Sequence, residues 1–231
     1  MKWSKVSEPY LPKYRKLMTA FFKEIASDRL KVRVMFTQNA HRPVGIPEDT
    51  RRESYFKLYY QFIKHAFGWE HRSDSRFKAR LRVYFDQFPH TGHQVRIFRQ
   101  FILGLNSSPV FRAANLTIRE DDLAEVRSHD HVLLQCLDIV LGSMAFRLND
   151  KHKAREPGQR VRGKKTRAKE QLYKSIFKEI EAISPRFKIG ISTGTRGDPA
   201  RRWHDAYRHW RFCPKEHDEF DQPLPKGAGK K

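Results

Sequence analysis

A single aspartate interrupts the most apolar segment of the chain. Residues 132–146 read VLLQCLDIVLGSMAF, and Asp138 lies near the middle. A helix that is apolar on nearly every face belongs in a core, where an unpaired carboxylate loses its hydration and must neutralise or find a partner. The polar residues of this segment and its start follow one another at i, i+4, i+7 and i+11, and so share one stripe of a helix: His131, Gln135, Asp138 and Gly142.

Two interpretations of Asp138 stay open on the sequence. In the simpler one, the carboxylate is bonded to a neighbouring backbone amide or arginine. In the other, it is directed at a metal ion or a polar cleft, which requires a second acid elsewhere in the chain. Gly142 on the same stripe would let another backbone or a ligand approach the helix closely.

Asp86 is an available second acid. The segment 80–86, RLRVYFD, alternates charged and apolar residues with the period of a half-buried strand, and Pro89 and Gly92 follow it. Asp86 would point away from the face of Phe85 at the carboxyl end of this strand, where side chains commonly line clefts in α/β proteins. An aspartate that opens a turn is the alternative.

Strands and helices alternate along the chain. Periodicity predicts helices over 8–27, 51–69, 92–105, 130–147 and 168–183, and strands over 30–36, 80–86, 115–118, 123–126 and 187–191. Ser128 is the expected N-cap of the 130–147 helix. This order predicts a layered α/β protein with one domain over residues 1–214 and a disordered tail over 215–231.

The composition favours a polyanionic partner. Lys and Arg number 47 against 26 Asp and Glu, a net charge of +21, which attracts nucleic acid first and acidic membranes second. No apolar leader and no run of about 20 apolar residues occurs, so we expect a cytoplasmic protein without a membrane span. Cys136 and Cys213 predict no disulfide, and nothing indicates an oligomeric state.

A basic connector over residues 150–170 concentrates the charge. Residues 151–170 hold nine Lys and Arg against two Glu, which predicts a mobile connector or the tip of a helical hairpin. A solvated face that only aids solubility is the alternative, but a net charge of +7 favours contact with phosphates. The expected nucleic-acid-binding residues are Arg160, Arg162, Lys164, Lys165 and Arg167.

Aromatic residues interleave with arginines and histidines over residues 201–214. Trp203, Tyr207 and Trp210 would share one face of a helix, which favours packing against the core. Stacking on unpaired bases is the second interpretation. Elsewhere the chain lacks the motifs GxxxxGK[ST], GxGxxG, HExxH and GxSxG, and paired CxxC motifs, which argues against nucleotide-loop, zinc and serine-hydrolase chemistry.

Pieces of the chain, in order, resemble the family called domain of unknown function 3800. They are KWSK at residues 2–5, RVYFD at 82–86, LQCLD at 134–138 with Gly142, and the closing segments FKIGIS at 187–192 and YRHW at 207–210. That family comprises bacterial and phage proteins with a ribonuclease-H-like fold. The resemblance implies a ribonuclease-H-like mixed sheet flanked by helices, with a helical, basic insertion after residue 150.

The resemblance also implies a chemistry. It points to a nuclease that hydrolyses phosphodiester bonds of RNA or DNA with two Mg²⁺ or Mn²⁺ ions, because such ions prefer carboxylate oxygens. Asp86 and Asp138 would be the catalytic metal ligands, with Gln135 and His131 orienting them or the water. Asp130 is a further possible ligand, although its charge near a helix start also suits the helix dipole.

The sequence departs from the family at its start. Family members open with an acidic strand, and a glutamate precedes the KWSK segment, whereas here Met1 occupies that region. We therefore expect the opening strands and two acidic ligands to be missing, and little or no turnover. The rival predictions are a non-catalytic basic nucleic-acid-binding module and an interaction protein whose charge only keeps it soluble.

Overall fold

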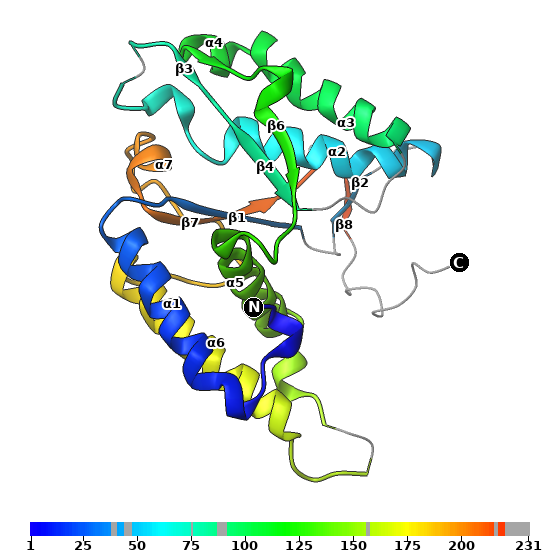
Figure 1. The fold of residues 1–231 in the computed structure, drawn as a ribbon, viewed down its shortest axis with the longest axis vertical. Coiled ribbons are helices and arrows are strands. Elements are labelled where there is room, and N and C mark those ends of the chain that lie inside the picture. The colour runs from blue at the N-terminus through cyan, green and yellow to red at the C-terminus, as the bar shows by residue number, and fades with distance from the viewer. Residues whose placement is uncertain are drawn as a thin grey trace.

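The computed structural model describes residues 1–37, 41–43, 48–74, 76–86, 92–155, 158–214 and 217–219. It is a mixed α/β structure in which two long strands cross between two groups of helices (Figure 1). These strands, β1 (Val32–Thr37) and β7 (Tyr207–Phe212), pair in parallel with Val32 opposite Tyr207. Each group of helices has its own apolar core.

The first core lies between the β1–β7 pair and three helices: α1 (Leu11–Ala26), α5 (Val132–Leu148) and α6 (Lys164–Ile183). The single turns η1 (Trp3–Lys5) and η2 (Glu8–Tyr10) precede α1, and η6 (Lys151–Lys153) follows α5. Apolar residues of α1 and α6 recur at helical spacing and bury one face of each helix. Phe22, Ile139, Ile176 and Tyr207 meet there with almost no exposed surface.

The second core is built from shorter pieces. Its helical elements are α2 (Glu48–His65), η3 (Trp69–His71), α3 (Gly92–Leu103), η4 (Gly104–Ser107), α4 (Pro109–Ala113) and η5 (Glu120–Asp122). Its strands are β3 (Ala79–Arg80) with β5 (Leu116–Thr117), and β4 (Val83–Asp86) with β6 (Leu123–Val126), both pairs parallel. Aromatic rings fill this core, among them Phe56, Phe98 and Phe111.

The predicted strands at 30–36, 80–86, 115–118 and 123–126 are confirmed in position as β1, β3 with β4, β5 and β6. The described strands form four two-stranded sheets, the fourth being antiparallel β2 (His41–Pro43) with β8 (His217–Glu219). The strand predicted at 187–191 is absent: Phe187 is buried, but the chain turns at Gly190, whose φ is +89°.

Residues 201–214 are not one helix, so the predicted helical face is wrong. A short helix, α7 (Arg201–His204), ends before Asp205, and β7 follows. The aromatic residues nevertheless pack inward, because Tyr207 lies in the first core and Trp203 against the second. Aromatic residues spaced by three and four positions are typical of a helix. Here Trp203 lies in the short helix α7, whereas Tyr207 and Trp210 lie in the strand β7.

Helix α5 differs from prediction in two respects. It is not buried all round, because Val132, Leu133 and Leu141 are 48–55% exposed, and Asp138 is exposed as well. It begins one residue after His131, which occupies the N-cap position, so the expected cap by Ser128 is wrong. The backbone N–H of Ser128 donates to Asp86 instead.

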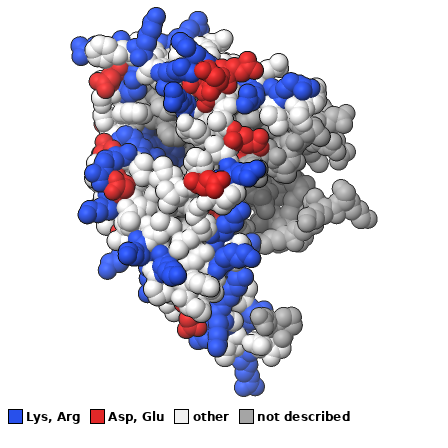
Figure 2. Space-filling model, viewed as in Figure 1, with Lys and Arg blue, Asp and Glu red and all other residues white. Residues whose placement is uncertain are grey.

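The basic connector is the tip of a helical hairpin, because α5 and α6 pack against each other and α6 already begins at Lys164. Lys and Arg side chains follow this protrusion to its end (Figure 2). Of the tail predicted to be disordered, residues 217–219 form β8, and 215–216 and 220–231 lie outside the described residues. No helix in the described part of the chain is long and apolar enough to cross a membrane. Neither Cys136 nor Cys213 is in a disulfide.

Candidate functional site

The polar stripe of α5, formed by His131, Gln135, Asp138 and Gly142, receives the first residues of the chain. An Asp138 carboxylate oxygen, Oδ2, accepts the backbone N–H of Trp3 at 2.7 Å. A Cβ atom on Gly142 would lie 2.2 Å from Cγ of Trp3, so only glycine leaves room for this indole. Oε1 of Gln135 accepts a hydrogen bond from the amino group of Met1, and Nε2 of Gln135 donates one to the carbonyl of His129 at 2.8 Å. Asp138 is thus bonded to a backbone amide, as in the simpler interpretation.

Asp86 ends β4 on the surface, as predicted. Its Oδ1 accepts the backbone N–H of Ser128 at 3.3 Å, which ties the end of the strand to the segment that leads into α5. Nearby Tyr59 has a raised pKa, chiefly because it is buried, then because of its hydrogen bond with Tyr55, with a smaller effect from the Asp86 charge. Asp86 therefore links β4, which packs in the second core, to the segment that leads into α5 of the first core.

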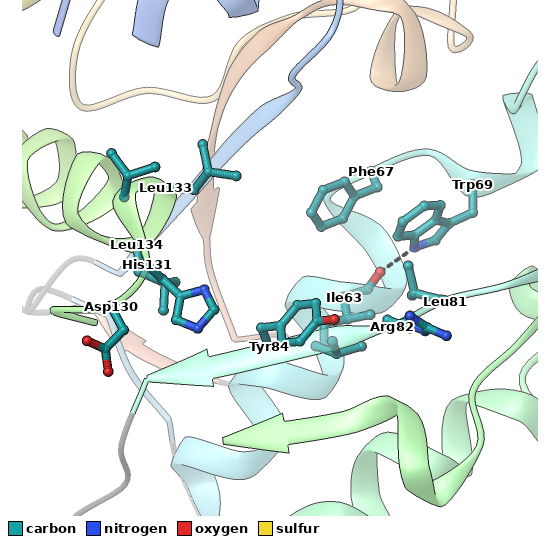
Figure 3. A pocket seen from close by; sticks show the side chains of 12 residues that line it. Ile63, Phe67, Trp69, Leu81, Arg82, Tyr84, Asp130, His131, Leu133 and Leu134 are labelled. Atoms are coloured by element: carbon teal, nitrogen blue, oxygen red, sulfur yellow. Dashed lines mark hydrogen bonds between the residues drawn. The ribbon is translucent and has the colours of Figure 1, made fainter. Parts of the chain in front are cut away.

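Asp130 and His131 line a cavity of about 550 Å³ between β4, α5 and the end of α2, and the His131 ring points toward Tyr84 whereas the Asp130 carboxylate points away from it (Figure 3). The His131 ring stacks near Tyr84, with centroids 6.3 Å apart and planes inclined by 28°. Asp130 pairs with His129 at 3.3 Å. Apart from Arg82, the other lining residues are aromatic or aliphatic, and Trp69 among them donates its indole N–H to the Ile63 carbonyl at 2.6 Å. The lining is mostly aromatic and aliphatic, with Asp130 as its one acid among the described residues.

The acids that the sequence singled out do not form one cluster. Among the residues that the structure describes, no three His, Cys, Asp or Glu side chains gather in a group that could hold a metal ion. Asp138 accepts the backbone N–H of Trp3, and Asp86 accepts that of Ser128. Asp130 pairs with His129. The described residues therefore do not fit the two-ion site that the resemblance implies.

The predicted nucleic-acid-binding residues of the basic hairpin, residues 151–167, differ in how exposed their side chains are. Four are exposed: Arg160, Lys164, Lys165 and Arg167. Arg162 is half-buried and donates to the carbonyl of His152 at 2.8 Å and to the Glu170 carboxylate. Burial opposes ionisation of Glu170, but Arg162 and Lys174 together lower its pKa. Arg162 therefore holds the hairpin in shape.

Two buried arginines were not expected from the sequence. Arg33, 8% exposed, donates to the carbonyls of Arg202 at 2.8 Å and Trp203 at 3.2 Å; burial and then the charge of Arg208 lower its pKa to about 10. Arg208, 7% exposed, binds Asp205 at 2.5 Å. Alternation of arginine with aromatic residues in β7 was the available signal, but it does not reveal which arginines turn inward.

Comparison of the chain with protein-family models, with curated proteins and with solved structures found no match.

Proposed function

We propose that this protein binds nucleic acid through the basic hairpin. The observation that carries the proposal is the exposed cation cluster of Arg160, Lys164, Lys165 and Arg167 around the start of α6. Within the described residues, none of the four forms an ion pair with a carboxylate. Their charge is therefore available to phosphates, which supply most of non-specific affinity for nucleic acid.

The start of α6 adds to this charge. The N-cap residue is Gly163, and no side chain caps the helix there. The first backbone N–H groups of an α-helix lack partners within it and favour anions. The Arg162–Glu170 pair fixes the loop immediately before this turn, so the exposed cations and the helix start act at one place.

The test compares duplex DNA binding by fluorescence anisotropy for the intact chain and two four-residue variants. One variant changes Arg160, Lys164, Lys165 and Arg167 to Gln. The matched control removes four exposed cations elsewhere, Lys23, Lys57, Lys78 and Arg112. We expect the hairpin variant to lose affinity by about 100-fold near 0.1 M salt and the control by far less. Equal losses would assign binding to net charge alone and overturn the proposal.

A second candidate function is metal-dependent phosphodiester hydrolysis by a ribonuclease-H-like fold. One observation favours it: two of the pieces that resemble domain of unknown function 3800 touch each other, through Trp3 with Asp138 and Gly142. Against it, no three His, Cys, Asp or Glu side chains of the described residues gather in a group that could hold a metal ion.

Hydrolysis is tested by incubating labelled RNA and DNA with the intact chain in Mn²⁺, Mg²⁺ or EDTA. Asp86→Asn and Asp138→Asn are the matched variants. Products that require metal and vanish in both variants would support this candidate. Metal-independent products, or products that persist in both variants, would exclude these two acids from the reaction.

A further inference from the structure

A second basic surface lies beyond the other end of α6. The loop over residues 184–196 encloses a cavity of about 440 Å³ that Arg186, Lys188 and Arg196 line together with the hydroxyl residues Ser184, Ser192 and Thr193. Among the described residues that line this cavity there is no Asp or Glu. A concave surface with three cations and several hydroxyls is suited to an anion with many acceptor oxygens, such as a phosphate.

Strand β7 holds two of these hydroxyls in a defined orientation. The backbone N–H of His209 donates to Oγ1 of Thr193 at 3.0 Å, and that of Arg211 donates to Oγ of Ser192 at 2.9 Å. Each hydroxyl accepts in these bonds, so each keeps its own proton to donate to a ligand.

The buried Arg208 holds the 184–196 loop in place by hydrogen bonds to its backbone. Its guanidinium donates to the carbonyls of Thr193 and Gly194 while it pairs with Asp205. The rim is thus supported before any ligand arrives, which lowers the cost of binding. The C-terminal end of α6 nearby carries about half a negative charge, which three cations outweigh.

The two basic surfaces are joined along α6. Ile189 follows Lys188 and lines a neighbouring cavity of about 360 Å³ together with Arg147, Lys174 and His152. The carbonyl of His152 in turn binds Arg162 of the basic hairpin. Glu170 also lines this cavity, but it is paired with Arg162 and Lys174. Because Lys174 is paired with Glu170, Arg147 is the lining cation of this cavity that extends the positive charge from the loop toward the hairpin.

We propose that the 184–196 loop is a second phosphate-binding site, and that the partner is a nucleic acid long enough to reach both ends of α6. This inference rests on the proposed function. The 20 residues of α6 span about 30 Å. At about 3.4 Å per base-pair step, a duplex needs about nine base pairs to contact the hairpin and the loop together.

The experiment measures binding of DNA stem-loops with stems of about 6 and about 18 base pairs over a range of salt concentrations. The loop variant changes Arg186, Lys188 and Arg196 to Gln, and a control changes Lys23, Lys78 and Arg112 to Gln. On the long stem we expect the loop variant to bind at least about 10-fold more weakly, with a salt slope smaller by about 3. On the short stem, which occupies one site at a time, we expect a loss of at most about twofold.

The outcomes separate this inference from the proposed function. A loop variant that binds the long stem with the affinity and salt slope of the unchanged chain overturns the second site, even if the hairpin variant loses binding. An unchanged chain that binds neither stem overturns the proposed function and, with it, this inference. A control that loses as much as the loop variant also overturns the second site.

Discussion

The backbone N–H of Trp3 lies 2.7 Å from the Asp138 carboxylate, across 135 residues of sequence. The indole ring of Trp3 lies against Gly142 and contacts Phe146 edge to face, with ring centroids 5.6 Å apart. The Lys169 ammonium lies 5.2 Å from the centroid of the Trp3 ring. The polar stripe of α5 and the KWSK segment are thus two sides of one contact. This contact joins α5 and α6 at the base of the basic hairpin.

Gly142→Ala should destabilise the protein, although alanine ordinarily favours a helix interior by about 0.5–1 kcal/mol over glycine. The new Cβ would lie 2.2 Å from Trp3 Cγ, and overpacking of this kind costs about 1–3 kcal/mol. Urea unfolding of Gly142→Ala, Trp3→Ala and the double variant measures the coupling. The cost of Gly142→Ala should disappear in the Trp3→Ala background; an equal cost in both backgrounds would contradict the contact.

Asp138→Ala should lower the free energy of unfolding by about 1 kcal/mol, because the Trp3 N–H loses its acceptor. Asp138→Asn retains a carbonyl oxygen and should cost less than half as much. Both variants remove the charge of Asp138, but only Asp138→Ala also removes the hydrogen-bond acceptor. The difference between them therefore measures the hydrogen bond. Equal stability of Asp138→Ala and the unchanged chain in urea would show that this bond does not hold the N-terminal segment.

Arg162 and Arg160 should behave oppositely despite their proximity in sequence. Arg162→Ala leaves the half-buried Glu170 without its strongest partner and should destabilise the protein by about 1–2 kcal/mol, a value discounted for partial exposure. Arg160→Ala should change stability by less than about 0.5 kcal/mol but weaken binding to DNA. Thermal unfolding and anisotropy on the same samples check both; a stability loss confined to Arg160→Ala would reverse the assignment.

Acid should destabilise the fold through His209. Burial lowers its pKa from 6.5 to about 4, so between these values the unfolded chain binds a proton that the native chain does not. The neutral imidazole therefore stabilises the native state above pH 6.5, and this contribution, about 3 kcal/mol at most, is lost as the pH falls toward 4. Its Nε2 lies 2.8 Å from the Tyr207 hydroxyl, so His209→Gln keeps a polar group there.

The measurement is urea unfolding of the unchanged chain and His209→Gln between pH 7 and pH 4.5. The stability advantage of the unchanged chain should shrink as the pH falls. His65 and His152, whose pKa values burial also lowers, add to the acid sensitivity of both proteins and cancel in this difference. Parallel curves would show that His209 does not titrate as an isolated buried group.

Local periodicity was sufficient for elements with one buried and one exposed face. Helices α1, α3 and α6 and strand β4 show such patterns, and the structure has them within a few residues of the predicted bounds. Periodicity failed where burial is set by distant partners. The exposed Leu141 of α5 cannot be distinguished in sequence from its buried neighbour Val140, because only the packing of α1 and α6 decides which side is covered.

The candidate site was predictable only in part. The stripe on α5 follows from helical geometry, but its partner Trp3 lies 135 residues away and leaves no local signal. Charge density located the basic hairpin, whereas nothing in the sequence separates the structural Arg162 from its exposed neighbours. The 184–196 loop was missed because its cations are dispersed among Ser, Thr and Gly residues and converge only in space.

The salt dependence of duplex binding tests the central claim most directly. Four phosphate contacts at the basic hairpin should contribute about −3.6 to the slope of log K against log salt. Changing Arg160, Lys164, Lys165 and Arg167 to Gln should reduce the slope by about that amount, while the control at Lys23, Lys57, Lys78 and Arg112 leaves it nearly unchanged. An identical slope for the hairpin variant and the unchanged chain would contradict the claim that this hairpin contacts nucleic acid.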